Sequence, residues 1–157
     1  MLPDNLSQHP LAAAVDGFDA DAIKGGKRER GELTLEIAAG KIASVCGFLK
    51  YDQEFVRLST VTAVDRFPAE PRFEVVYHLH SVTRNQRVRL KCRLRGGDAV
   101  IESVTPVWRG ADWYEREVFD LFGINFLNHP GLRRILMPDD WEGYPLRKDY
   151  PITGSRV

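Results

Sequence analysis

The sequence has only two cysteines, no long apolar run and no excess of charge of either sign. Cys46 and Cys92 lie far apart and neither belongs to a Cys-x-x-Cys pair, which disfavours zinc and iron-sulfur clusters because these need more thiolates at closer spacing. We expect two buried, reduced thiols. The longest apolar runs, such as residues 42–49, are far shorter than the roughly 20 residues that span a bilayer. Lys plus Arg and Asp plus Glu each number 22, so no overall field attracts nucleic acid or an anionic membrane.

Signatures of common cofactor and hydrolase sites are also missing. The sequence contains no G-x-G-x-x-G, no P-loop, no nucleophile elbow and no HExxH. It also lacks the nucleophile, base or metal constellation expected of a free-standing enzyme. The start, MLPDNLSQHP, has no basic region followed by an apolar core. Because no secretory signal is visible, we expect the chain to remain in the cytoplasm.

What is present fits one globular domain. A chain of 157 residues with 43% hydrophobic and 28% charged residues is long and apolar enough for a single core. Alternating apolar residues predict strands, helical spacing predicts helices, and a short loop between the last two strands predicts an antiparallel hairpin. The expected class is α+β: a mixed or antiparallel sheet covered by helices on one face, with an extended C-terminal tail. The expected elements are a short helix at 6–15, a glycine-rich loop at 23–31, strands at 32–38, 57–65, 72–81 and 86–95, and helices at 39–51 and 112–122.

The strand at 86–95 places five cations on its outward side, which raises a sheet-based RNA-binding module as an alternative function. Such modules stack bases on exposed aromatic side chains, and the outward residues here include none. The neighbouring strand offers Glu74, His78 and His80 on the same face, so cross-strand ion pairing is the simpler interpretation. Two imidazoles without further ligands are too few to specify a metal site. The five cations are Arg87, Arg89, Lys91, Arg93 and Arg95.

The ends of the helix at 112–122 carry recognisable signals. Asp112 is expected to be its N-cap, because Glu115 follows three residues later, where a capping box places a carboxylate. Gly123 is expected to end the helix in the left-handed conformation.

The same helix has aromatic side chains on more than one face. Trp113 lies opposite the core-facing residues, and Trp, Tyr, Phe and Arg are the residue types that protein interfaces concentrate. For Arg116 and Asp120, an ordinary i, i+4 ion pair is the alternative to an interface role. The residues expected to face the core are Tyr114, Val118, Leu121 and Phe122.

The segment at 128–152 cannot fold on its own. Its four prolines interrupt any regular ladder or helix, so it is extended. Its nine large apolar side chains return roughly 1.5 to 3 kcal/mol each when fully buried, whereas ordering the backbone costs about 1 to 2 kcal/mol per residue. We therefore expect another chain to supply the remaining contacts. Bidentate arginine pairs fix the register of an extended ligand. The charged residues of the segment that suit such an interface are Arg133, Arg134, Arg147, Lys148 and Asp149.

Two stretches resemble one known family. The residues VTPVWRGADWYEREVFDLFGINFLNHPGLRRILMPDDWEGYPLRKDYP, at 104–151, resemble the signature of the C-type (30-kDa-type) subunit of proton-pumping NADH:quinone oxidoreductase, which is respiratory complex I. The residues LSTVTAVDRFPAEPRFEVVYHLHSVTRNQRVRLK, at 58–91, resemble the strands of that family. The E-R-E and L-R-K-D blocks within the first stretch are highly specific. The chain departs from the family pattern at Gly131, where Asp is common, and at Tyr144, where His is expected.

The resemblance implies a non-catalytic subunit of the peripheral, cytoplasm-facing arm at the bacterial plasma membrane. It implies no FMN or iron-sulfur cluster in this chain, since other subunits hold those cofactors, which pass electrons from NADH to quinone in a reaction that drives proton translocation. Family members pack beside a D-type (49-kDa-like) chain, which forms the quinone site together with a B-type chain. The equivalent subunit of a membrane-bound hydrogenase or of an F420H2 dehydrogenase also resembles this family and is the nearest alternative.

These inferences divide the chain into two parts. Residues 1–127 form the α/β domain, which ends with the helix that carries Glu115-Arg116-Glu117, and residues 128–157 form an extended partner-binding tail. No catalytic, cofactor-binding or metal-binding residue is expected. The residues expected at the partner interface are Trp113, Glu115, Arg116, Glu117, Asp120, Arg133, Arg134, Trp141, Leu146, Arg147, Lys148 and Asp149.

Overall fold

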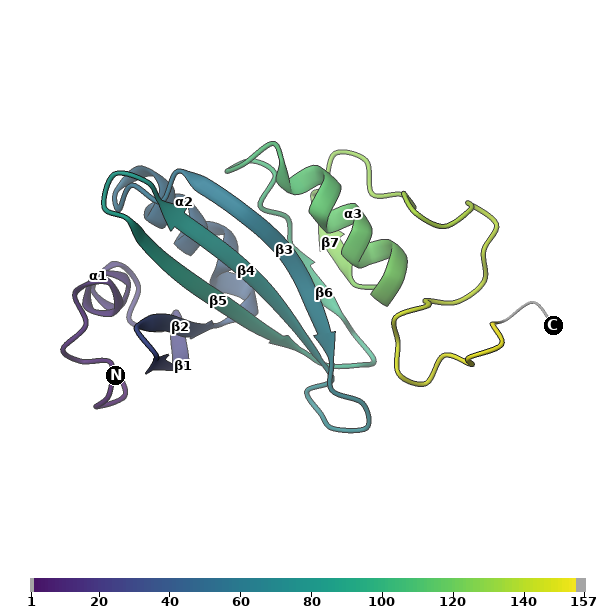
Figure 1. The fold of residues 1–157 in the computed structure, drawn as a ribbon, viewed down its shortest axis with the longest axis horizontal. Coiled ribbons are helices and arrows are strands. Elements are labelled where there is room, and N and C mark those ends of the chain that lie inside the picture. The colour runs from purple at the N-terminus through teal and green to yellow at the C-terminus, as the bar shows by residue number, and fades with distance from the viewer. Residues whose placement is uncertain (1, 155–157) are drawn as a thin grey trace.

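Five strands form the main sheet of the computed structural model, which describes residues 2–154 (Figure 1). The strand order is β1-β2-β5-β4-β3, with β2 and β5 parallel and the other neighbours antiparallel. Strands β6 and β7 form a separate parallel pair. The predicted α+β class with a mixed sheet is confirmed. The elements are α1 (Pro10–Phe18), β1 (Ile23–Glu29), β2 (Glu32–Ile37), the 3-10 helix η1 (Ala39–Lys41), α2 (Ile42–Tyr51), β3 (Arg57–Asp65), β4 (Phe73–Ser81), β5 (Gln86–Leu94), β6 (Val100–Glu102), α3 (Ala111–Phe122) and β7 (Asn125–Leu127).

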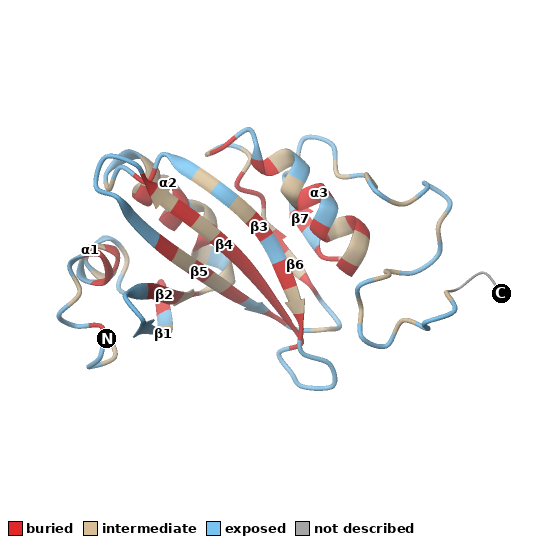
Figure 2. Ribbon diagram, in the orientation of Figure 1, coloured by how far each residue is buried: buried red, intermediate tan, exposed pale blue. Residues whose placement is uncertain are grey.

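The hydrophobic core lies on one face of the main sheet. Tyr77 of β4 and Cys92 of β5 point to that face and are fully buried, as are Val45 and Cys46 of α2. Both thiols are therefore buried, as predicted. In Figure 1, α2 lies behind the sheet and α3 runs alongside β3. Figure 2 shows the buried residues concentrated in these elements, whereas the tail is intermediate or exposed along its length.

The glycine-rich segment at 23–31 is a strand and not the loop that its composition predicted. Strand β1 pairs with β2 along its length, and Arg30 and Gly31, both with positive φ, make the tight turn between them. Glycine is needed at one position in particular. A Cβ on Gly26 would lie 2.5 Å from the carbonyl oxygen of Thr34, so only glycine permits this close approach of the two strands.

The first helix begins four residues later than predicted, at Pro10. His9 precedes it, and the ring Nδ1 of His9 accepts a hydrogen bond from the amide of Leu11. The proline occupies the first helical position, where its missing N–H is tolerated. The helix predicted at 39–51 is also present, although its first turn is the 3-10 helix η1.

Three outward cations of β5 pair with acidic side chains from the neighbouring strands. Arg89 pairs with Glu32 at 3.1 Å, and Lys91 pairs with Glu74 at 2.8 Å. A third pair joins Arg93 to Glu36 of β2 at 2.9 Å. This arrangement matches the predicted cross-strand ion pairing and leaves these cations with carboxylate partners within the chain.

Candidate partner interface

Helix α3 directs one carboxylate into the core, and this carboxylate does not cap the helix. Glu115 is fully buried and accepts hydrogen bonds from Ser103 Oγ at 2.6 Å and from the amide of Val104 at 2.7 Å. Burial raises the pKa of Glu115 to about 7. The prediction of Asp112 as N-cap was wrong, because Gly110 precedes the helix and no side chain caps it. The prediction that Gly123 ends the helix in the left-handed conformation is confirmed, with φ of 73°.

Asp112 instead contacts the beginning of the tail. Its Oδ1 lies 3.1 Å from Nε2 of His129, whose side chain is fully buried and is 3.9 Å from the carboxylate of Glu115. The backbone carbonyl of Asp112 is also within 3.2 Å of the same ring nitrogen. The root of the tail is thus fixed against α3 by an imidazole between two carboxylates.

Asp120 holds the tail by its backbone. The carboxylate is fully buried, and its Oδ2 accepts hydrogen bonds from the consecutive amides of Ile135, Leu136 and Met137 at 3.1, 2.7 and 2.8 Å. Its Oδ1 pairs with Arg134 at 2.7 Å. Burial acts to raise the pKa of the Asp120 carboxyl, but the amides and the guanidinium outweigh burial and lower that pKa below its ordinary value.

The alternative interpretation of Arg116 and Asp120 as an i, i+4 ion pair is not supported, because each residue binds the tail. Arg116 donates to the carbonyls of Arg133 and Arg134, each at 3.2 Å, while Asp120 takes Arg134 as its partner. That alternative considered the helix alone, whereas the tail offers both residues hydrogen-bond partners. Arg116 also lies over the ring of Trp113, 5.2 Å from its centroid, in cation–π geometry.

A second contact fastens the tail at the C-terminal end of α3. The amide of Leu146 donates to the carbonyl of Leu121 at 3.0 Å, and Arg147 Nε donates to the carbonyl of Phe122 at 2.7 Å. These carbonyls belong to the last turn, where a helix leaves its acceptors unsatisfied. Tyr144, which departs from the family pattern, packs closely against Gly123, where a Cβ would lie 2.6 Å from the tyrosine ring.

A third contact joins the tail to the loop between β3 and β4. Arg72 forms a bidentate pair with the buried Asp65, with both distances 2.9 Å, and also binds Asp149 at 2.7 Å. The amide of Lys148 donates to Asp65 at 2.8 Å. The hydrogen bonds from Arg72 hold the pKa of Asp65 well below its ordinary value. Sequence reasoning missed Asp65 and Arg72, although Asp65 stands at a core-facing position of its strand, where an unpaired carboxylate is costly.

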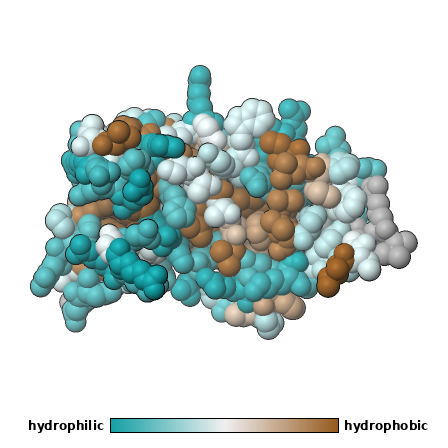
Figure 3. Space-filling model, viewed as in Figure 1, coloured by the Kyte–Doolittle hydropathy of each residue, from teal (hydrophilic) through white to brown (hydrophobic). Residues whose placement is uncertain are grey.

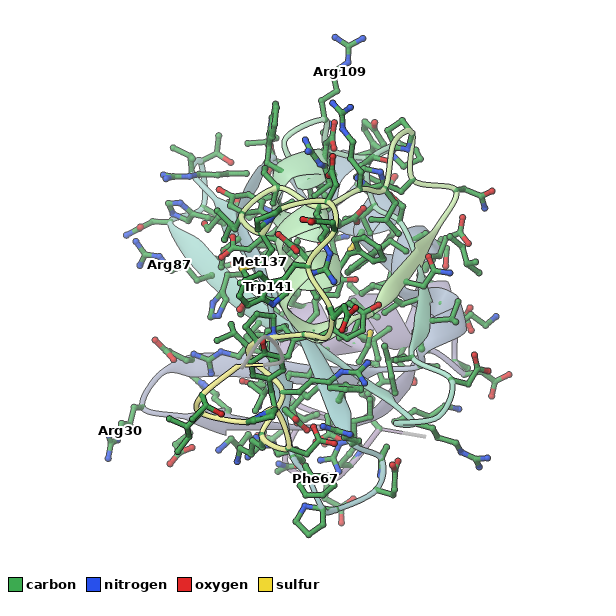
Figure 4. The ribbon with its side chains drawn as sticks, turned by 90° about the vertical axis from the view of Figure 1, so that its right-hand side faces the viewer. Arg30, Phe67, Arg87, Arg109, Met137 and Trp141 are labelled. Carbon is green, nitrogen blue, oxygen red and sulfur yellow. The ribbon has the colours of Figure 1, made fainter. Side chains whose placement is uncertain are left out.

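The tail thus has polar contacts within the chain that sequence reasoning, which looked to another chain for the remaining contacts, did not anticipate. In Figure 4, the tail that carries Met137 and Trp141 crosses in front of α3. The indole of Trp141 donates to the hydroxyl of Tyr150 at 3.1 Å, so these two tail residues contact each other. The energy comparison counted apolar anchors and left out the polar ones, and the polar ones hold this segment.

The predicted interface residues fall into two groups. Those whose polar groups bind within the chain are Glu115, Arg116, Asp120, Arg134, Arg147 and Asp149. Those that are exposed and whose side chains have no hydrogen bond or ion pair described above are Trp113, Glu117, Arg133, Leu146 and Lys148, although the amides of Leu146 and Lys148 bind Leu121 and Asp65. Asp149 is exposed as well as paired, and Trp141 is half-buried and donates to Tyr150. Leu136, which the prediction did not include, is 62% exposed.

Residues 2–154 contain no group of three or more His, Cys, Asp or Glu side chains placed to hold a metal ion. Within the same residues, every helix is too short or too polar to cross a membrane.

Comparison with known proteins gives one consistent result. The profile of the family described as respiratory-chain NADH dehydrogenase, 30 Kd subunit, matches residues 35–156. A protein of Geobacter sulfurreducens, named as the C subunit of NADH-quinone oxidoreductase, is 51% identical over 126 residues, which cover 80% of this chain and 78% of that protein. A protein of Roseiflexus castenholzii with the same name is 45% identical over 154 residues, which cover 97% of this chain and 88% of that protein.

Two solved structures share the fold. A trypsin-resistant fragment (1-134) of Nqo5 is 29% identical, with a TM-score of 0.62 over 67% of this chain and 86% of the fragment. A chain of the membrane-bound sulfane sulfur reductase, an archaeal respiratory membrane complex, is also 29% identical, with a TM-score of 0.77 over 90% of this chain and 84% of that chain. The chain therefore belongs to the family of the 30-kDa subunit of respiratory-chain NADH dehydrogenase.

Proposed function

We propose that this chain is a structural subunit whose residues 128–157 contact a D-type (49-kDa-like) chain next to a B-type chain, on the cytoplasmic side of the bacterial plasma membrane. The chain itself contributes no catalytic residue. FMN and iron-sulfur centres of other subunits carry the electrons from NADH to quinone. The observation that carries the proposal is the path of the tail, which is held along α3 by backbone and charged groups while large apolar side chains stay exposed.

The ionisable groups at this surface support a structural role. Glu115, Asp120 and Asp65 are the most deeply buried charged groups near the tail, and each already has hydrogen-bond partners within the chain. A catalytic acid or base needs access to a substrate, and these three groups are enclosed by the chain itself.

An equivalent subunit in another respiratory complex is the second candidate, and the likeness to the sulfane sulfur reductase chain favours it. That chain is 29% identical, whereas the proteins named as the C subunit of NADH-quinone oxidoreductase are 45% and 51% identical. The higher identity favours NADH-quinone oxidoreductase. The RNA-binding alternative loses support, because Arg89, Lys91 and Arg93 are paired with carboxylates.

Truncation tests the proposed function. A chain that ends at Leu127, after the last residue of β7, is co-expressed with a tagged D-type chain and compared with the full chain. We expect the truncated chain to remain folded by circular dichroism and to be absent from the purified pair. Co-purification at the level of the full chain would overturn the proposal. The matched control is the full-length chain with Val82→Ser, a substitution at an exposed turn position of the sheet domain.

A further inference from the structure

The tail runs along α3 from the first half of the helix to its C-terminal end, so successive tail residues contact successive positions of the helix. Arg116 binds the backbone at 133–134, Asp120 binds the amides at 135–137, and the last turn of α3 binds Leu146 and Arg147. At a rise of about 1.5 Å per residue, the helix from Trp113 to Phe122 is about 14 Å long. The tail is therefore fastened at three levels of α3, and its outer side extends over the whole helix.

The inner side of the tail is polar, and its groups already have partners. Asp120 and Arg134 are bound to each other and to the backbone, and Arg147 donates to the end of α3 while lying 4.7 Å from the ring centroid of Tyr144. Leu132 packs against the hydrophobic core. These residues therefore have little left to offer a second chain.

Three large apolar side chains of α3 and the tail are exposed to solvent. Trp113 is 60% exposed, Leu136 is 62% exposed and Leu146 is 52% exposed. On the face seen in Figure 3, apolar side chains gather over the region of α3 and the beginning of the tail. Exposed large apolar side chains held on a fixed backbone are typical of protein interfaces, because burying them costs little further conformational entropy.

Two cations accompany this apolar surface. Arg133 precedes Leu136 by three residues and Lys148 follows Leu146 by two, and both side chains are exposed. Within residues 2–154, neither forms an ion pair. Exposed charges next to apolar contacts form the polar rim that steers association and fixes register.

We propose that Trp113, Leu136 and Leu146 are the residues that bind the neighbouring subunit, with Arg133 and Lys148 facing carboxylates at the rim, while the buried charges serve only to hold the tail. The inference rests on the proposed function and assigns its contacts. The partner is a protein chain that presents an apolar surface bordered by acidic side chains. Under this inference, apolar side chains make the direct contacts with the partner, and most of the charged residues expected at the interface from the sequence do not.

The test uses the full chain co-expressed with the tagged D-type chain. The double variant Leu136→Ser, Leu146→Ser is expected to weaken binding about tenfold or more, while its thermal midpoint stays that of the wild type because both side chains are exposed. The control is Val82→Ser, which removes an equally exposed apolar side chain (59%) from the β4–β5 turn and is expected to leave binding unchanged.

A second arm tests the rim. Arg133→Glu with Lys148→Glu is expected to slow association and to reverse its dependence on salt, because salt screens the new repulsion, whereas Arg87→Glu, an exposed cation on β5, is expected to change neither. Wild-type binding by the Leu136→Ser, Leu146→Ser variant would overturn the inference. If the chain truncated at Leu127 also bound normally, the proposed function itself would fail. If only the truncated chain lost binding, the tail would bind through other residues and the proposed function would stand.

Discussion

The sheet domain and the tail are held by different kinds of contact. In the sheet domain, side chains such as Tyr77 and Leu90 are enclosed by other apolar side chains, and the stabilisation grows with the apolar area removed from water. In the tail, most apolar side chains remain partly exposed, and hydrogen bonds to Asp120 and Asp65 set the path. The domain is therefore expected to unfold as one unit, and the tail to open in sections without it.

A cavity in the core should have the largest effect. Leu90→Ala removes a fully buried side chain from the middle of β5, and we expect a loss of about 3 to 4 kcal/mol in the free energy of unfolding. Urea unfolding measures it. If the two regions are held independently, the chain truncated at Leu127 shows the same loss. A loss below about 1 kcal/mol would mean that the core does not carry the stability assigned to it.

Glu115 lies where the two regions meet, and its ionisation should make stability depend on pH. Its pKa is about 7 in the folded chain, against an ordinary value of 4.5. Between these values the folded chain keeps a proton that the unfolded chain has released, so stability falls as pH rises and the loss is complete above about pH 7. The total is about 3 kcal/mol.

The measurement for Glu115 is urea unfolding at a series of pH values from about 5 to about 8, which brackets the folded pKa. Glu115→Gln keeps an oxygen to accept from Val104 and has no proton to lose, so its stability should vary less than that of the wild type over this range. Parallel pH curves for the two proteins would contradict the assignment.

Asp120→Asn should affect the tail and spare the domain. The substitution replaces one carboxylate oxygen with a donor that cannot accept from the amides at 135–137 or from Arg134. We expect amide exchange in the tail to rise by tenfold or more, while global stability changes by about 1 kcal/mol or less. Hydrogen exchange read by mass spectrometry separates the two regions. Uniformly faster exchange, in the sheet as well as the tail, would show that they are coupled.

The smallest effect is expected on the outward face of β5. Arg89→Ala breaks an ion pair with the exposed Glu32, and such pairs contribute about 0.2 to 1 kcal/mol at most. Thermal unfolding at low and high salt should show a difference that disappears as salt rises. A loss that persists in high salt would indicate that the packing of the arginine stem, and not its charge, matters.

The regular elements were predictable where one pattern decides them. The alternation in β4 and β5 and the helical spacing of Ile42, Val45 and Leu49 are properties of a few neighbouring residues, so local sequence contains the answer. Strand β1 was missed because glycine usually marks a loop, and here the pairing with β2 overrides that preference.

The contacts of the tail were less predictable, for a physical reason. The composition of the tail, with its prolines and arginines, indicated an extended segment, and residues 128–154 contain no helix or strand. Which group binds which depends on residues far apart in the sequence, such as Arg72 and Asp149. The carboxylate of Asp120 binds backbone amides, and every non-proline residue carries such an amide. The side chains at 135–137 therefore give no signal from which the contact with Asp120 could be predicted.

This mode of binding has a consequence for how the tail tolerates substitution. Asp120 accepts hydrogen bonds from three backbone N–H groups and does not bind the side chains of the residues that carry them. Related chains are therefore free to exchange the amino acids at 135–137 for almost any others and still follow the same route. Proline alone is barred from these three places, since it brings no N–H to the acid.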